Sequence, residues 1–303
     1  MIESEPNSGL WLFLAFNLKP EWPVSALANC PKCAIAVRSA YQAACRVPNN
    51  QMDDKLRQNL SDLPEFQSER PEPVFNVPGV IVGLLAVFVV VHLVRKFSGA
   101  GIDDWIILRF AFSAARYGGA PELQGMILPG GSGAMIWTFF SHMFLHGDWA
   151  HLLINGLWML AFGSVVARRL GAVRFILFSL MTAAFGALAH LLVYWGQFAM
   201  MIGASGAIAG QMAGAVRLIF SVPGGLANLQ NGDFSQVRVV SLRHLILVRG
   251  AFMFIGIWVL VNFVVGLSGF GAGEHISRIA WEAHLGGFLS GLLLFDLFDR
   301  RVR

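Results

Sequence analysis

Six long apolar runs account for most of the chain after residue 76. They cover Val77–Val94, Trp149–Ala167, Phe175–Phe198, Met200–Val216, Gly250–Leu267 and Ile279–Phe298. Each is close to the ~20 residues that a helix needs to cross a bilayer core of about 30 Å. Because lipid offers the backbone no hydrogen-bonding partner, apolar runs of this length span it as helices. The runs therefore predict an all-α membrane protein, a bundle of six transmembrane helices.

The composition agrees with a membrane protein and argues against nucleic-acid binding. Only 13% of the residues are charged, whereas a soluble globular chain carries about 25%. The net charge of +4 comes from basic residues that mostly flank apolar runs, where they set the orientation of the spans. The predicted partner surface is therefore a lipid bilayer, and no nucleic acid is expected.

The distribution of arginines predicts that both termini are cytoplasmic. The arginines cluster after the second, fourth and sixth runs: Arg168, Arg169 and Arg174; Arg217, Arg238, Arg243 and Arg249; and Arg300, Arg301 and Arg303. Short loops rich in Lys and Arg stay on the cytoplasmic side. The connection between the first two runs breaks this pattern and forms a long first outer loop. Within it, residues 103–118 are expected to lie in the membrane interface as a helix.

Residues 1–75 differ from the rest of the chain because they hold many prolines and charges. This composition predicts a poorly ordered cytoplasmic extension, followed by the membrane domain at residues 76–299 and a short cytoplasmic tail at 300–303. Met52 is a candidate alternative start. Cys30 and Cys33 have the spacing of half a zinc site, but no second pair follows, so no structural zinc is expected.

Four polar side chains stand out near the starts of three runs. His151 and Asn155 open the second run, four residues apart on one helical face. Ser205 lies early in the fourth run and His284 early in the sixth. In the predicted topology these runs all begin at the outer face, so the four side chains lie within roughly 10 Å of it. Polar residues inside a membrane are costly and therefore indicate function.

Small residues allow the fourth and sixth runs to approach closely. They recur at every fourth position: Gly206, Gly210 and Gly214 in one run, and Ala283, Gly287 and Gly291 in the other. This interval lets helix backbones come into contact. A single serine in such a run is more often a packing residue. With both series present, however, Ser205 and His284 are predicted to reach hydrogen-bond distance.

These residue types suit acyl transfer. A serine hydroxyl becomes a good nucleophile when a neighbouring base takes its proton, and His284 is the candidate base for Ser205. The developing oxyanion needs donors, for which His151, Asn155 and the backbone N–H of Ser205 are candidates. Glu282 lies on another side of the helix from His284. No carboxylate therefore completes a triad, and a Ser–His dyad is expected.

Three motifs occur in order along the chain. They are "HMFLHGDWAHLLINGLWMLAFG" at 142–163, "GASGAIAG" at 203–210 and "AHLGGFLSG" at 283–291. Together they resemble the HxxxHxxxxHxxxN, GxSG and AHxxGxxxG motifs of the rhomboid intramembrane serine proteases, of the bacterial six-span type. The resemblance implies that Ser205 is the nucleophile, His284 the base, and His151 and Asn155 the oxyanion helpers.

The resemblance also implies a substrate and a location. Rhomboids cleave transmembrane segments of other membrane proteins and need no cofactor, so a multi-pass protein of the bacterial inner (plasma) membrane is expected. The chain departs from the family pattern at several positions. Thr138 follows Trp137 where an arginine is common, Ala209 replaces an aromatic residue found in some members, and Ala167 and Arg168 stand where many have acids. None of these positions belongs to the dyad.

Parts of the sequence also bear on three other functions. His142, His146 and His151 are candidate metal ligands, and the first two have a metal-ligand spacing, but no glutamate accompanies them as in HExxH, so no metal is expected. A transporter would need charged residues deep in the bundle or broken helices in paired halves. Neither feature is evident in the sequence. A non-catalytic rhomboid-like pseudoprotease that binds membrane proteins is the alternative. Such proteins typically lack the serine or the histidine, whereas this chain keeps both Ser205 and His284.

Overall fold

The computed structural model describes residues 77–118, 125, 127–222, 237–268 and 280–299. They belong to one compact unit, Pro73–Arg303. The extension predicted at residues 1–75 and the tail predicted at 300–303 lie outside the described residues.

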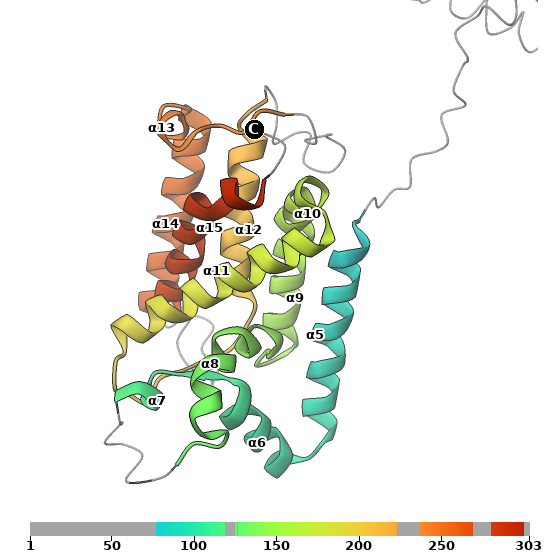
Figure 1. Ribbon diagram of the computed structural model, residues 1–303, viewed down its shortest axis with the longest axis vertical. Helices are drawn as coiled ribbons and strands as arrows, with labels where there is room; N and C mark the ends of the chain where they lie inside the picture. The colour runs from blue at the N-terminus through green and yellow to red at the C-terminus, as the bar shows by residue number, and fades with distance from the viewer. Residues whose placement is uncertain (1–76, 119–124, 126, 223–236, 269–279, 300–303) are drawn as a thin grey trace, which may run out of the picture. The chain divides into compact units, whose positions relative to one another are not determined.

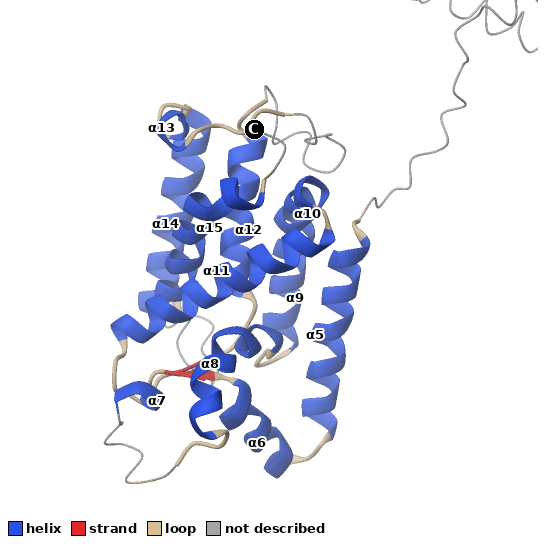
Figure 2. Cartoon of the chain, in the orientation of Figure 1, coloured by secondary structure: helices blue, strands red, loops and turns tan. Residues whose placement is uncertain are grey.

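The described part of this unit is built mainly from helices (Figures 1 and 2). The long ones are α5 (Gly79–Phe97), α11 (Ala172–Val193), α12 (Ser205–Ile219), α14 (Arg249–Ser268) and α15 (Trp281–Phe298). A further helical segment consists of α9 (Trp149–Trp158), the π-helical turn η4 (Met159–Gly163) and α10 (Ser164–Leu170). Shorter helices are α6 (Ala100–Phe110), α7 (Ala115–Gly118), α8 (Gly131–Ser141), η3 (His142–Phe144) and α13 (Leu242–Leu245).

Four helical segments are long and apolar enough to cross a membrane. They are Gly79–Phe97, Trp149–Leu170, Ala172–Val193 and Arg249–Leu267, and they coincide with four of the six predicted spans. The other two predicted spans form α12 and α15. Helix α12 has only 15 residues, and all of them from Gly206 to Ile219 are buried. Because α12 contacts protein rather than solvent or lipid, it needs neither the length nor the hydropathy of a lipid-exposed span.

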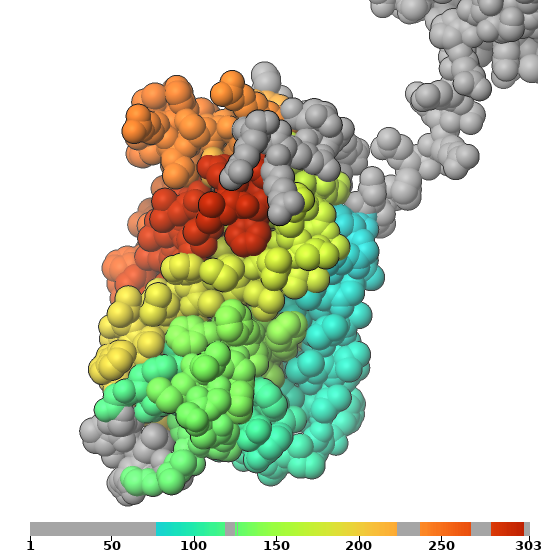
Figure 3. All heavy atoms as spheres, in the orientation of Figure 1, coloured from blue at the N-terminus to red at the C-terminus, as the bar shows by residue number. Residues whose placement is uncertain are grey.

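Helix α12 lies at the centre of the bundle, packed between α11 and α15. Figure 3 shows α11 and α15 side by side on the near face, and α12 contacts these two partners through its glycines. A Cβ on Gly210 would collide with Thr182 of α11, and a Cβ on Gly214 would lie 2.6 Å from the ring of Phe295 in α15. Glycine at these positions therefore lets α12 sit in a space that larger residues would close.

The start of α12 differs from the prediction, which placed its helix from Met200. Met200 and Met201 instead form strand β2, which pairs antiparallel with β1 (Phe112–Ser113). Gly203 then takes a φ of 115°, a left-handed value that glycine adopts without strain. The helix consequently begins at Ser205, so this residue is the first of its helix rather than one already inside it.

The first outer loop also differs from the prediction. The single helix expected at residues 103–118 is divided into α6 and α7, because Phe112 and Ser113 pair with β2 between them. This pairing ties the loop to the segment that leads into α12. The loop is thus connected by backbone hydrogen bonds to the residues just before Ser205.

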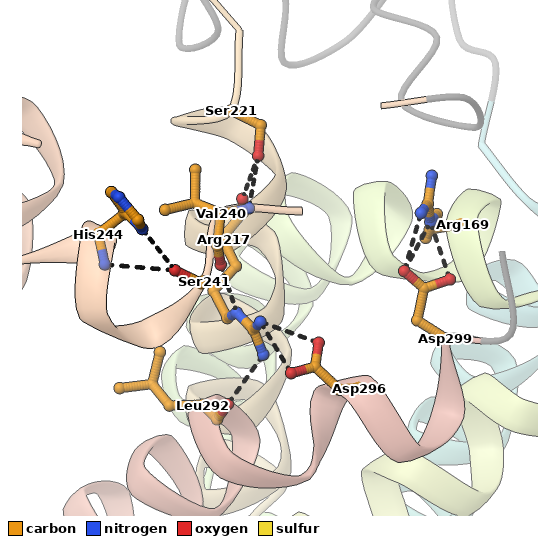
Figure 4. A network of polar contacts seen from close by, with 9 residues as sticks. All are labelled: Arg169, Arg217, Ser221, Val240, Ser241, His244, Leu292, Asp296 and Asp299. Carbon is orange, nitrogen blue, oxygen red and sulfur yellow. Dashed lines mark hydrogen bonds and ion pairs between the residues drawn. The ribbon is translucent and has the colours of Figure 1, made fainter. Parts of the chain in front are cut away.

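The opposite end of the bundle is held by two arginines (Figure 4). Arg169 of α10 pairs with Asp299 at 2.8 Å, and both side chains are almost fully buried. Arg217 of α12 pairs with Asp296 of α15 at 2.8 Å and donates to the Leu292 carbonyl at 3.1 Å. These contacts fix α10 and α12 against the last turns of α15, far along α12 from Ser205.

Candidate active site

Ser205 and His284 are brought together by the first turns of two packed helices. Ser205 is the first residue of α12, and His284 is the fourth residue of α15. The Nε2 atom of His284 lies 2.7 Å from Oγ of Ser205, a hydrogen-bond distance. Both residues are only partly buried. Neither residue is therefore fully enclosed by the described part of the chain.

The close approach of these helices depends on glycine at two levels. A Cβ on Gly287 would collide with the carbonyl oxygen of Gly206, and one on Gly291 would lie 2.5 Å from that of Gly210. Both contacts are with backbone, which cannot swing aside as a side chain does. At Gly206 itself the nearest heavy atom to an added Cβ is 3.6 Å away. The need for glycine is thus stricter on α15 than at Gly206.

The position of Ser205 gives it a favourable backbone environment. The first N–H groups of a helix have no acceptor within that helix, and the helix dipole places partial positive charge there. The first α-helical bond onto this end runs from Ile208 N to the carbonyl of Ala204. The N–H groups of Ser205 and the next two residues therefore lie before the regular series of helical hydrogen bonds. A negative charge forming beside Ser205 would be stabilised by them.

His151 lies beside the segment that precedes Ser205. A Cβ added to Gly203 would be 2.6 Å from Nε2 of His151, so the ring packs on the Gly203 backbone. The backbone N–H of His151 donates to the carboxylate of Asp148, the N-cap of α9, at 2.8 Å. Asn155 is buried one turn further along and donates to the His151 carbonyl at 2.9 Å. The structure thus places the His151 ring against the segment just before Ser205. Asn155 lies one helical turn further along α9 than His151.

Comparison with known proteins assigns the family. The family model of the rhomboid domain matches residues 133–300, more than half of the chain. The chain belongs to the rhomboid family. Curated relatives named rhomboid protease GlpG include that of Serratia proteamaculans (strain 568), which is 24% identical over 269 residues, 88% of this chain and 77% of that protein. GlpG of Yersinia pestis (strain Pestoides F) is 29% identical over 161 residues, 52% of this chain and 47% of that protein. The match therefore spans about half the length of the Yersinia relative.

Glu282 of this rhomboid faces away from the Ser205–His284 pair. Its Oε1 atom lies 2.6 Å from Nδ1 of His190 in α11, and both side chains are buried. The carboxylate that stands two residues before His284 in the sequence is thus paired with a different histidine. The hydrogen-bond partner of Glu282 is thus His190 rather than His284.

Asn262 is a residue of this site that the sequence analysis missed. Its Oδ1 atom lies 2.6 Å from Nδ1 of His284, on the side of the ring opposite Ser205. The signal was present in the sequence, because Asn262 is the one amide, hydroxyl or charged side chain between Gly250 and Leu267. Helix α14 directly precedes α15 in the sequence and contacts it in the structure. No spacing rule, however, links positions 262 and 284.

Two further histidines, His142 and His146, lie between α8 and α9. Burial lowers the pKa of His142 to about 4 and that of His146 to about 3, so both are neutral at pH 7. Nδ1 of His142 contacts the carbonyl of Thr138 at 2.9 Å. The carbonyl of His146 accepts from Arg95 at 2.6 Å. Among the residues that the structure describes, no group of three or more His, Cys, Asp or Glu is placed to hold a metal.

Thr138, one of the positions where the sequence departs from the rhomboid pattern, is accommodated locally. Thr138 is buried and donates to the carbonyl of Ala134 at 2.6 Å. An arginine still meets Trp137, since the guanidinium of Arg109 from α6 lies 5.2 Å from the centre of its ring. The indole of Trp137 donates to the Arg109 carbonyl at 3.1 Å. The loop thus places an arginine against this tryptophan from a different part of the sequence.

Proposed function

We propose that this rhomboid is an intramembrane serine endopeptidase in which Ser205 and His284 form the catalytic dyad. The observation that carries the proposal is the 2.7 Å contact between Oγ of Ser205 and Nε2 of His284. A histidine at this distance can take the hydroxyl proton as the oxygen attacks a carbonyl carbon. Family membership and relatives named rhomboid protease support the same activity.

The reaction follows from the positions of these groups. Oγ of Ser205 adds to the scissile carbonyl while its proton passes to Nε2 of His284. The resulting oxyanion is stabilised by the N–H groups at the start of α12 and by His151 and Asn155. The imidazolium then protonates the leaving amide nitrogen, and the peptide bond breaks to leave an acyl-enzyme. Water, deprotonated by the same imidazole, hydrolyses this ester and frees Ser205.

The proposed substrates are transmembrane segments of other membrane proteins. In the proposed topology α5, α9–α10, α11, α12, α14 and α15 are six spans with both termini cytoplasmic, in a bacterial inner membrane. The arginines at the Arg169 and Arg217 end support this orientation. Ser205 then lies in the outer part of the bilayer, so substrates are cut near their outer ends. Helix-breaking residues near the bond favour cleavage because a helix hides its carbonyls.

The test compares the wild type with Ser205→Ala, using purified protein and a model single-span substrate. We expect cleavage by the wild type and none by the variant, with equal folding and membrane insertion. A fluorophosphonate should label Ser205 and block activity, while chelators should not. Substantial cleavage by a clean Ser205→Ala preparation would contradict the proposal. Inhibition by a chelator, reversed by zinc, would instead support a metal mechanism.

A further inference from the structure

Helix α14 carries a polar side chain where an apolar one would be expected. This side chain is Asn262. Its sequence neighbours Val261 and Phe263 are hydrophobic and are 53% and 44% exposed. A polar group among apolar spans is costly unless it is hydrogen-bonded. Asn262 is only half-buried, and it makes hydrogen bonds with both its amide atoms.

The two hydrogen bonds of Asn262 fix the orientation of its amide. Nδ2 lies 3.0 Å from the carbonyl oxygen of Trp281, the first residue of α15. A carbonyl can only accept, so the atom facing it must be the amide nitrogen. The amide oxygen, Oδ1, consequently faces Nδ1 of His284 at 2.6 Å.

The orientation of the amide then fixes the tautomer of His284. Because Oδ1 of Asn262 is an acceptor, Nδ1 of His284 must carry the hydrogen and donate it. In a neutral imidazole the other nitrogen, Nε2, is then unprotonated and accepts. Nε2 is the atom 2.7 Å from Oγ of Ser205. One chain of hydrogen bonds thus runs from Ser205 through His284 and Asn262 to the Trp281 backbone.

We propose that Asn262 is a positioning residue that holds His284 in the tautomer able to take the proton of Ser205. The inference rests on the proposed function, since it assigns the group that supports the base. The other tautomer would present N–H to Ser205 and could not act as a base. Nδ1–H continues to donate to Asn262 after His284 becomes an imidazolium. A neutral amide provides this acceptor without placing a carboxylate inside the membrane, which is costly.

A purely structural role for Asn262 is the competing explanation, because its bond to Trp281 also tethers α14 to α15. Two substitutions separate the roles. Asn262→Leu removes both bonds at similar volume. Asn262→Asp keeps an oxygen facing Nδ1 of His284 but loses the N–H that donates to Trp281. Val261→Leu on the exposed face of the same helix is the matched control.

We expect Asn262→Leu to lower kcat about tenfold to hundredfold, less than the 10²–10⁴ contributed by acid–base catalysis as a whole. KM should change little, Val261→Leu should match the wild type, and Asn262→Asp should recover most of the lost kcat. If Asn262 served only to tether α14 to α15, Asn262→Leu and Asn262→Asp would lose kcat equally. The loss would then follow the decrease in their unfolding temperatures. Equal losses of that kind, or wild-type kcat in Asn262→Leu, would overturn the proposal.

A second measurement does not depend on proteolysis. NMR of isotope-labelled histidine distinguishes protonated from unprotonated ring nitrogens, and the His284 signals are those missing from His284→Gln. We expect a protonated Nδ1 in the wild type and in Ser205→Ala, and a mixture of tautomers in Asn262→Leu. An unchanged tautomer in Asn262→Leu would overturn the inference. Absence of cleavage by the wild type, with this tautomer present, would count against the proposed function and not against the role of Asn262.

Discussion

At the residue scale, the base and the proposed oxyanion donors differ in what their loss removes. In the proposed mechanism His284 accepts a proton, so His284→Ala should abolish nearly all turnover. Loss of one oxyanion donor costs about 10²–10³ in a soluble serine protease. Here His151, Asn155 and the α12 N–H groups are proposed to share the charge, so His151→Ala and Asn155→Ala should each cost less. Their effect should fall on turnover more than on apparent affinity, as kinetics with a single-span substrate will measure. Wild-type turnover in both variants would leave the backbone as the only donor.

The buried histidines make a second residue-scale prediction, on acid stability. The pKa of His142 falls from 6.5 to about 4 in the folded protein because burial disfavours its charged form. Between those two values only the unfolded state takes up the proton, so folding becomes less favourable as pH falls. Each such histidine costs ~1.4 kcal/mol per pH unit in that range. Above pH 6.5 neither state is protonated and the contribution is constant.

His142→Gln provides the comparison because glutamine does not titrate and can still donate to the Thr138 carbonyl. Its thermal unfolding in detergent should decline less steeply than that of the wild type from pH 6.5 to pH 4.5. Identical slopes would show that His142 titrates normally in the folded protein, contrary to its burial.

At the scale of elements, the interface between α12 and α15 predicts an asymmetry between two glycines. Gly287→Ala would drive a methyl group into the carbonyl of Gly206, and overpacking of this kind typically costs ~1–3 kcal/mol. Gly206→Ala meets its nearest atom at 3.6 Å and should be tolerated in stability. Thermal unfolding should therefore separate the two variants. Activity should fall further in Gly287→Ala, because a shift of α15 also moves His284 from Ser205. Equal stability of the two variants would contradict this packing.

The elements also mark what the sequence could predict. Hydropathy identified α5, α9–α10, α11 and α14, because each segment is long and apolar enough to cross a membrane. The start of α12 was wrong because the pairing of Met200–Met201 with Phe112–Ser113 is a contact between distant segments. Ser205 and His284 could be paired from their glycine-flanked positions. Asn262 could not be assigned as the partner of His284, because its depth relative to His284 depends on how α14 packs.

At the scale of the whole molecule, two aspartates near the end of α15 predict different contributions to stability. The Asp299–Arg169 pair is buried, with side-chain exposures of 2% and 1%, whereas Asp296 beside Arg217 is 61% exposed. Removing one partner of a buried pair costs about 3–5 kcal/mol, while exposed pairs contribute ~0–1 kcal/mol. Asp299→Ala should therefore lower the unfolding temperature far more than Asp296→Ala. Equal losses would mean that the Arg169 charge reaches water.

The proposed topology makes a further prediction for the whole molecule. Fluorescent-protein fusion to the C-terminus should fluoresce in cells, since that terminus is proposed to be cytoplasmic. Mass spectrometry of cleavage products should place the cut near the outer end of the substrate helix. Cuts near the cytoplasmic end would contradict the orientation, even if the dyad is right.

The shortness of α12 has a consequence for the supply of water. Fifteen residues make a helix about 22 Å long, whereas the bilayer core is about 30 Å thick. In the proposed topology the Arg217 end lies at one membrane surface, which would leave Ser205 ~8 Å below the other, at a depth where lipid alone would exclude water. Beside Ser205, the backbone N–H groups at the start of α12 and the ring of His151, packed on Gly203, are polar groups. In the proposed mechanism these groups would have to let water reach the acyl-enzyme, because its hydrolysis needs water.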